Sequence, residues 1–162
     1  ASYMKVILGK TAMLFEAATQ AGAIIAGANE THIEALQLYG RHLGIAFQLV
    51  DDVLDYQSSA EEMGKNVGDD LAEGKPTLPL IHAMKHGTEE QRQLIRQAIR
   101  KGGLDDLEPI REAVIASGAI DYTFSQAQLQ IEQAMQQLTL IPKSAFRDIL
   151  EHLAQLAVNR RT

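Results

Sequence analysis

Three aspartates stand in an otherwise apolar stretch, QLVDDVLDYQ, at residues 48–57. On a helix with about 100° between successive residues, Asp55 lies about 40° and Asp52 about 100° around the axis from Asp51. Gln48 falls between them, at about 60°. These four polar side chains therefore share one arc of a predicted helix.

The rest of the circumference of this predicted helix is apolar. Its apolar positions are Leu43, Ala46, Phe47, Leu49, Val50, Val53 and Leu54. A helix that is apolar over most of its circumference is a core helix, so the carboxylate arc is expected to face an internal cavity or a cleft. The alternative for a bare D-D-x-x-D pattern is a solvated acidic face, and the apolar surroundings argue against it.

Carboxylates held so close together need a cation or protons. Two of them about 6 Å apart repel by roughly 3 kcal/mol at an effective dielectric constant near 20, and partial burial adds a desolvation cost. The chain has no cysteine, and the neighbouring ligands are oxygens. Mg²⁺ typically takes one or two carboxylates, several waters and substrate phosphate oxygens. The motif therefore predicts a Mg²⁺ site shared with a phosphate-bearing ligand.

Positive charge follows in residues 61–79, where Lys65 and Lys75 each come after a glycine. Glycines, prolines and charges interrupt the helical pattern here, which predicts a segment that is largely loop. Taken alone, the two lysines are ordinary loop charges. Beside three aspartates they become candidate diphosphate ligands, because lysine acts as a point charge on phosphate oxygens and a glycine-flanked loop can close over a ligand. Thr77 is expected to cap a helix that resumes at about Leu78.

Helical spacing of apolar residues extends over nearly the whole chain and predicts an all-α protein. The clearest segments are a helix from about 144 to 160 with a cap at Ser144, a helix to Arg100 opened by a Thr88–Gln91 capping box, a short helix before Gly118, and a long helix over residues 119–138. Residues 11–28 are crowded with alanine and glycine, which favours a buried helix. No repeat or linker divides the 162 residues, so one domain is expected.

Composition excludes several classes of protein. A net charge of −6 argues against a nucleic-acid-binding surface, and no apolar run approaches the roughly 20 residues of a membrane span. The absence of cysteine fits a cytoplasmic protein. The five histidines show no metal-ligand spacing and are interpreted as surface or core residues. Because the chain starts without Met, we interpret it as a fragment of a longer protein.

Three motifs, in this order, resemble those of the trans-polyprenyl diphosphate synthases. KTAMLFEAA, from Lys10, resembles the Lys-Thr motif of that family, GIAFQLVDDVLDY resembles its second aspartate-rich motif, and GKNVGDDLAEGKPTLPLI resembles the lysine loop that follows. The amino-acid sequence of the loop most resembles that of bacterial members of the family that make an octaprenyl chain. The family's first aspartate-rich motif has no counterpart here. The chain therefore resembles the C-terminal half of the all-α isoprenoid synthase bundle.

The resemblance implies a Mg²⁺-dependent prenyltransferase. Such an enzyme condenses isopentenyl diphosphate head to tail with an allylic diphosphate such as farnesyl diphosphate, and here would make a long, octaprenyl chain for quinone side chains. It implies a homodimer for the full-length protein, and an inactive chain when this half stands alone. Two alternatives are another isoprenoid enzyme, such as a terpene cyclase, and a helical interaction module whose acidic arc binds no metal.

The resemblance also implies roles for the metal-binding residues. Asp51 would be the main ligand of one Mg²⁺, and Asp52 and Asp55 would support it directly or through water. Asp69 would reach the metal through water.

The remaining roles concern the substrate. Lys10 and Lys65 would contact the allylic diphosphate, and Lys75 would bind diphosphate and help to close the loop. Thr11 and Gln48 would lie along the nascent carbocation. An alternative for Gln48 is a buried amide that satisfies backbone groups.

Overall fold

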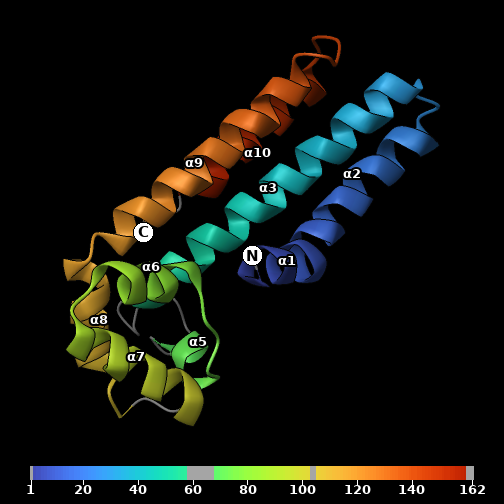
Figure 1. Ribbon diagram of the computed structural model, residues 1–162. Coiled ribbons are helices and arrows are strands. Elements are labelled where there is room, and N and C mark those ends of the chain that lie inside the picture. The colour runs from blue at the N-terminus through green and yellow to red at the C-terminus, as the bar shows by residue number, and fades with distance from the viewer. Residues whose placement is uncertain (1, 58–67, 103–104, 160–162) are drawn as a thin grey trace. The chain divides into compact units, whose positions relative to one another are not determined.

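The computed structural model describes residues 2–57, 68–102 and 105–159 (Figure 1). Within these ranges the chain is built from helices joined by turns and contains no strand, which confirms the all-α prediction. Contacts divide it into two compact units, Ala1–Val50 with Gln126–Arg161, and Asp51–Ser125 with Thr162. The prediction of one domain stays a prediction.

The first unit begins with a helical run and a helical hairpin. Helix α1 (Ser2–Ile7) continues through the π-helix η1 (Leu8–Ala12) into α2 (Met13–Ile25). Gly27, with φ of 69°, ends α2 in the left-handed conformation that glycine tolerates best. Asn29 Oδ1 then accepts a hydrogen bond from His32 N at 2.9 Å and caps α3 (Glu30–Gln57), which runs back beside α2 in Figure 1.

Helix α3 is a core helix in the first unit, as its apolar circumference predicts. Its buried apolar side chains there are Ala35, Tyr39, Leu43, Ile45, Ala46, Leu49 and Val50. The other helices of the unit are the second part of α9 (Ala119–Leu138) and α10 (Ala145–Asn159). Tyr39 Oη donates a hydrogen bond to Leu150 O at 2.8 Å, and burial raises the pKa of Tyr39 to about 12. This bond fixes α10 against α3.

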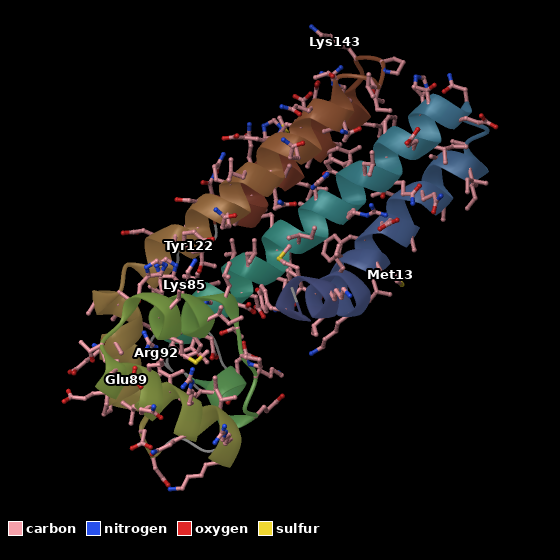
Figure 2. The ribbon with its side chains drawn as sticks, viewed as in Figure 1. Met13, Lys85, Glu89, Arg92, Tyr122 and Lys143 are labelled. Carbon is pink, nitrogen blue, oxygen red and sulfur yellow. The ribbon has the colours of Figure 1, made fainter. Side chains whose placement is uncertain are left out.

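The prediction of a buried helix over residues 11–28 is wrong for one face of α2. Leu14 is 71 % exposed and Ile25 is 86 % exposed, and Met13, labelled in Figure 2, belongs to the same exposed face. The small residues do allow close helix packing, but α3 covers only one side of α2. Periodicity cannot reveal this, because the sequence does not say which apolar face meets a neighbour.

The described residues of the second unit include the last turns of α3, four further helices and the start of α9. These helices are α5 (Asp69–Ala72), α6 (Leu78–His86), α7 (Glu89–Lys101) and α8 (Leu107–Ala116). Their apolar sides meet at a core that includes Leu71, Leu80, Ile95, Ile110 and Val114. Local packing of this kind gives the unit its own core.

Several predicted helix ends are confirmed. The capping box is present, with Gln91 N donating to Thr88 Oγ1 at 3.2 Å and Thr88 N donating to Gln91 Oε1 at 2.9 Å. The long predicted helix matches α9, and Ser144 Oγ accepts from Arg147 N at 3.2 Å at the start of α10. Both caps are made by residues close in sequence, which is why sequence alone can predict them.

The prediction for residues 61–79 is only partly covered, since residues 58–67 lie outside the described ranges. From residue 68 onward, the short helix α5 interrupts the predicted loop. Thr77 is the N-cap residue of α6, with Pro79 in its first turn, but its side chain makes no cap hydrogen bond. Thr77 is 4 % exposed, so its side chain packs inside instead of folding back over the helix end.

No helix in the described parts of the chain is long and apolar enough to cross a membrane. Exposed apolar residues instead form stripes on two helices of the first unit. Besides the α2 face, α10 exposes Phe146, Ile149, Leu153 and Leu156, at helical spacing. Apolar stripes of this kind favour association in water.

We expect the purified chain to self-associate through these stripes. Leu14→Gln combined with Ile25→Gln should lower the weight-average mass in sedimentation velocity, because it removes the two most exposed apolar side chains of α2. Gln133→Ala on the exposed side of α9 is the matched control and should change nothing. A parent chain that stays monomeric over the whole concentration range would contradict this expectation.

Candidate functional site

Two of the predicted catalytic residues meet in the first unit. Thr11 lies in η1 and Gln48 in α3, and the Thr11 hydroxyl donates a hydrogen bond to Gln48 Oε1 at 2.8 Å. The two residues are 37 positions apart, so this bond joins the Lys-Thr motif to the helix that carries the aspartates. Lys10, the residue before Thr11, is exposed. Its ammonium group is therefore open to an anionic ligand.

The segment that holds Lys10 and Thr11 is a π-helix, which sequence reasoning missed. π-helical turns inside α-helices are uncommon and are frequent at functional sites, because the extra residue redirects neighbouring side chains. Nothing in the spacing of KTAMLFEAA distinguishes a π-turn from an α-turn, so no sequence signal was available. Met13 N donates to the carbonyl oxygens of both Leu8 and Thr11 as the chain passes into α2.

A half-buried polar clamp, formed by Glu16, Gln37 and Arg41, fixes α2 against α3. Arg41 Nε and Nη2 each donate to the Glu16 carboxylate at 2.8 Å, and Gln37 Nε2 donates to Glu16 Oε1 at 2.6 Å. The hydrogen bond from Arg41 lowers the pKa of Glu16. Bidentate Arg–carboxylate pairs are directional, so the clamp orients the two helices as well as attracting them.

The aspartates of α3 lie in the second unit and differ in burial. Asp51 and Asp55 are half-buried, whereas Asp52 is 2 % exposed. On the predicted arc Asp52 stands at the edge, next to the apolar side, which accounts for its burial. The burial of Asp52 argues against a solvated acidic face at this position and agrees with the expected internal cavity or cleft.

Asp55 joins the end of α3 to the start of α5. Its Oδ2 accepts a hydrogen bond from Asp70 N at 3.2 Å, and its backbone carbonyl accepts one from Gly68 N at 3.1 Å. Gly68 has φ of 85°, which permits the sharp turn into α5. The predicted ligands Asp55 and Asp69 are thereby brought into the same region, together with Asp70, which sequence reasoning did not select.

The surroundings of Asp55 disfavour its charged form. Burial, together with the charge of Asp70, raises the pKa of Asp55 to about 6. A carboxylate in such surroundings gains from a nearby hard cation, and an oxygen-only donor set suits Mg²⁺ or Ca²⁺. The chemistry of these donors therefore suits a divalent ion. No three Asp, Glu or His side chains of the described ranges are gathered closely enough to hold a metal, and Mg²⁺ stays a prediction.

Lys75 is bonded to carboxylates in this structure. Its Nζ lies 2.7 Å from Glu73 Oε2 and 3.0 Å from Asp70 Oδ1, and these hydrogen bonds raise the pKa of Lys75. A diphosphate would have to compete with these two carboxylates for the ammonium group. The other predicted loop ligand, Lys65, lies outside the described residues.

Arg111 fixes the C-terminal end of α3 and was missed from sequence. Its Nε donates to the carbonyl oxygen of Tyr56 at 2.9 Å, which satisfies one of the last free carbonyls of the helix. The Tyr56 ring is fully buried, and burial raises the pKa of its hydroxyl. A cation 55 residues away gives no local sequence signal for such a contact.

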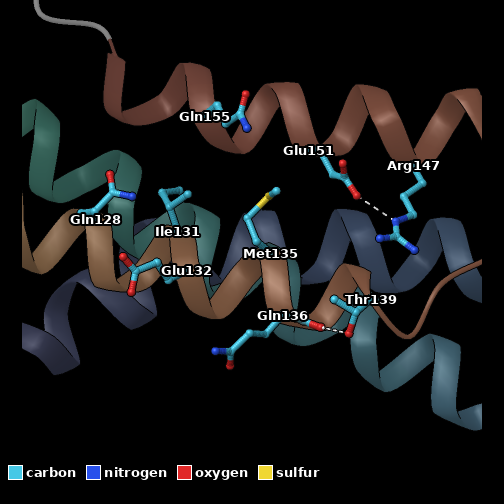
Figure 3. A pocket seen from close by; sticks show the side chains of 9 residues that line it. All are labelled: Gln128, Ile131, Glu132, Met135, Gln136, Thr139, Arg147, Glu151 and Gln155. Atoms are coloured by element: carbon cyan, nitrogen blue, oxygen red, sulfur yellow. Dashed lines mark hydrogen bonds and ion pairs between the residues drawn. The ribbon is translucent and has the colours of Figure 1, made fainter. Parts of the chain in front are cut away.

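A separate pocket of about 500 Å³ lies between α9 and α10 (Figure 3). Ile131 and Met135 project into it from α9, and Arg147 stands at one side, where Nε donates to Glu151 Oε1 at 2.8 Å. Its lining includes none of the predicted site residues. The pocket is therefore distinct from the residues discussed above.

We predict that Asp55→Asn stabilises the metal-free chain at neutral pH. The pKa of Asp55 is raised from 3.8 to about 6 on folding, so its charged form opposes folding above pH 6. Removing this charge should raise the free energy of unfolding by about 1 kcal/mol at pH 7.5, after discounting for solvent screening. The gain should shrink as the pH falls below 6 and vanish below 3.8.

Urea unfolding in EDTA at several pH values measures this effect. Asp105→Asn, which removes the same charge from an exposed position, serves as the control and should show no comparable gain. Equal stability of Asp55→Asn and the parent at pH 7.5 would contradict the prediction.

The chain matches the polyprenyl synthetase family model over residues 1–115. It is 52 % identical over 160 residues to octaprenyl diphosphate synthase of Escherichia coli, a match that covers 98 % of this chain and 50 % of that protein. The chain thus spans about half the length of the curated relatives it matches.

Solved structures show the same relation. A polyprenyl synthase from Caulobacter crescentus, complexed with calcium and isoprenyl diphosphate, superposes with a TM-score of 0.92 at 43 % identity, over 99 % of this chain and 49 % of that one. A geranylgeranyl pyrophosphate synthase from Corynebacterium glutamicum, complexed with isoprenyl diphosphate and magnesium, gives 0.87 at 32 % identity, over 96 % and 45 %. The fold is therefore that of the all-α isoprenoid synthases. The chain belongs to the polyprenyl synthetase family.

Proposed function

We propose that this chain is the C-terminal half of a trans-polyprenyl diphosphate synthase. The enzyme would join isopentenyl diphosphate head to tail to an allylic diphosphate such as farnesyl diphosphate. The observation that carries the proposal is the hydrogen bond between Thr11 and Gln48, which links the Lys-Thr motif to the helix that bears the aspartates. Two relatives named octaprenyl diphosphate synthase match this chain over about half of their own length, and their name supports this activity.

The metal assigned to the site is Mg²⁺. Asp51 would be its main ligand, Asp52 and Asp55 would support it, and Asp69 would reach it through water. The raised pKa of Asp55 supports this assignment, because a divalent cation would relieve the unfavourable charge. When bound, Mg²⁺ would supply charge neutralisation for the departing diphosphate.

The lysines of the chain are assigned to the diphosphate. Lys10 and Lys65 would contact the allylic diphosphate, and Lys75 would exchange its carboxylate partners for phosphate oxygens when the loop closes. The exposure of Lys10 supports its role. Lysine suits this task, since its ammonium group binds phosphate oxygens as a point charge.

Thr11 and Gln48 are assigned to the developing carbocation. The Thr11 O–H is directed to Gln48 Oε1, so the lone pairs of the Thr11 oxygen remain free to face positive charge. A fixed oxygen dipole stabilises a cation without reorganising during the reaction. The pair would therefore stabilise the allylic cation while water is kept from it.

The product length, the cellular location and the oligomeric state are proposed from overall similarity to the relatives. We propose an octaprenyl product that serves as a quinone side chain, from the 52 % identity to the octaprenyl enzyme of E. coli. We also propose a cytoplasmic homodimer for the full-length protein. Product analysis by thin-layer chromatography would test the chain length.

The proposed function is tested with a chimera in which this chain replaces the matching half of the E. coli enzyme. We expect the chimera to elongate farnesyl diphosphate with isopentenyl diphosphate, and this chain alone to be inactive. The reason is that half a site cannot neutralise the charge of the leaving group fully. Robust elongation by the isolated chain would contradict the half-site assignment, and an inactive but folded chimera would contradict the function itself.

In the same chimera, Asp51→Asn should lower turnover at least about a hundredfold, the loss typical when one group that stabilises developing charge is removed. The fold should persist, because the substitution keeps the shape of the side chain. A radiolabelled elongation assay gives the turnover and circular dichroism checks the fold. Asp105→Asn is the charge-matched control. Turnover of Asp51→Asn within tenfold of the parent, about 1.4 kcal/mol, would remove Asp51 from the metal site.

A further inference from the structure

Two glycines of α3 lie against the η1–α2 segment at very short range. A Cβ added at Gly44 would lie 2.7 Å from Ala12 Cα and 3.2 Å from Phe15 Cβ. A Cβ added at Gly40 would meet Thr19 Oγ1 and would lie 2.5 Å from the Phe15 carbonyl oxygen. At both positions the added Cβ would clash with backbone atoms, which cannot change rotamer as a flexible side chain can.

The close approach is confined to this side of the helix pair. Gly9 in η1 and Gly22 in α2 would meet nothing within 4 Å among the described residues if a Cβ were added. Gly22→Ala is therefore the same chemical change on the neighbouring helix, without the steric consequence. This contrast supplies a matched control within the same unit.

Gly44 lies close to both members of the Thr11–Gln48 pair. Its contact Ala12 follows Thr11 directly, and Gln48 lies one helical turn after Gly44 on α3. The contact between Gly44 and Ala12 therefore sets how closely η1 approaches α3 at the level of the 2.8 Å bond between Thr11 and Gln48.

We propose that Gly44 is a positioning residue, which acts by holding η1 close enough to α3 for Thr11 to bond Gln48. An added Cβ would have to move from 2.7 Å to at least about 3.5 Å from Ala12 Cα. An opening of about 0.8 Å would lengthen the Thr11–Gln48 distance beyond the roughly 3.0 Å limit of an O–H···O hydrogen bond. The catalytic meaning of this role rests on the proposed function, whereas the geometric claim does not.

The displacement should be local to η1. Further along, α2 is fixed to α3 by the Glu16–Arg41 ion pair and by Thr19 Oγ1, which donates to Leu36 O at 2.6 Å. These anchors lie after Ala12 in the chain, so α2 stays in place while η1 tilts away from Gly44. The tilt moves Thr11 and leaves the hairpin folded.

A double-mutant cycle tests the proposal without any activity. Thr11→Val and Gln48→Met, singly and together, give the coupling between the two side chains from urea unfolding. In the parent chain the coupling should change the unfolding equilibrium constant about fivefold, the effect typical of one hydrogen bond. In a Gly44→Ala background the coupling should disappear, which is a factor of about one. In a Gly22→Ala background it should stay about fivefold.

Each outcome of the cycle decides the proposal. Unchanged coupling in the Gly44→Ala background would overturn it, and so would equal loss in both glycine backgrounds. Failure of Gly44→Ala to fold would also overturn it, because Gly44 would then support the whole fold instead of the position of Thr11. Because no substrate is used, a positive result stands even if the chimera shows no prenyltransferase activity.

Discussion

Negative charge in poorly solvated surroundings constrains the C-terminal end of α3. The helix must be apolar over most of its circumference to form the core, yet it carries three aspartates in five residues. Burial and the nearby charge of Asp70 raise the pKa of Asp55 to about 6. The unfavourable energy of such a carboxylate is relieved by a cation, so the position that destabilises the free chain is also the one that suits a metal.

Helix α3 connects this charge to the rest of each unit. In the first unit, three residues of α3 make hydrogen bonds to other helices. Gln48 bonds Thr11, Arg41 bonds the Glu16 carboxylate, and Tyr39 bonds a backbone carbonyl of α10. In the second unit its last carbonyls are bonded by Gly68 N and by Arg111. Two glycines give it the close contact with η1 that a larger residue would prevent. One helix therefore determines where the candidate site residues of each unit lie.

The parts of the fold that depend on neighbours in sequence were predictable. The bounds of α9, the Thr88–Gln91 capping box and the Ser144 cap all follow from local periodicity and hydrogen bonding. The core character of α3 was predictable for the same reason. The three aspartates were selected from their types and spacing, whereas Thr11 and Gln48 came from the family resemblance, and the hydrogen bond between them was not predicted.

Features that depend on tertiary packing were not predictable. The exposed face of α2 looks identical in sequence to a buried one, and the π-helix η1 has no composition that distinguishes it. The contact between Arg111 and α3 joins residues 55 positions apart, which only the folded chain brings together. A helical wheel orders side chains around one axis but does not say what lies opposite each of them.

We propose that this half of the fold binds a divalent cation together with a diphosphate group. Isothermal titration of the chain with a geminal bisphosphonate, with and without Mg²⁺, measures this most directly. We expect heat of binding only when Mg²⁺ is present, and we expect this heat to be lost in Asp51→Asn but not in Asp105→Asn. Absence of Mg²⁺-dependent heat, or equal heat in the parent and Asp51→Asn, would contradict it and would favour a helical module whose acidic arc binds no metal.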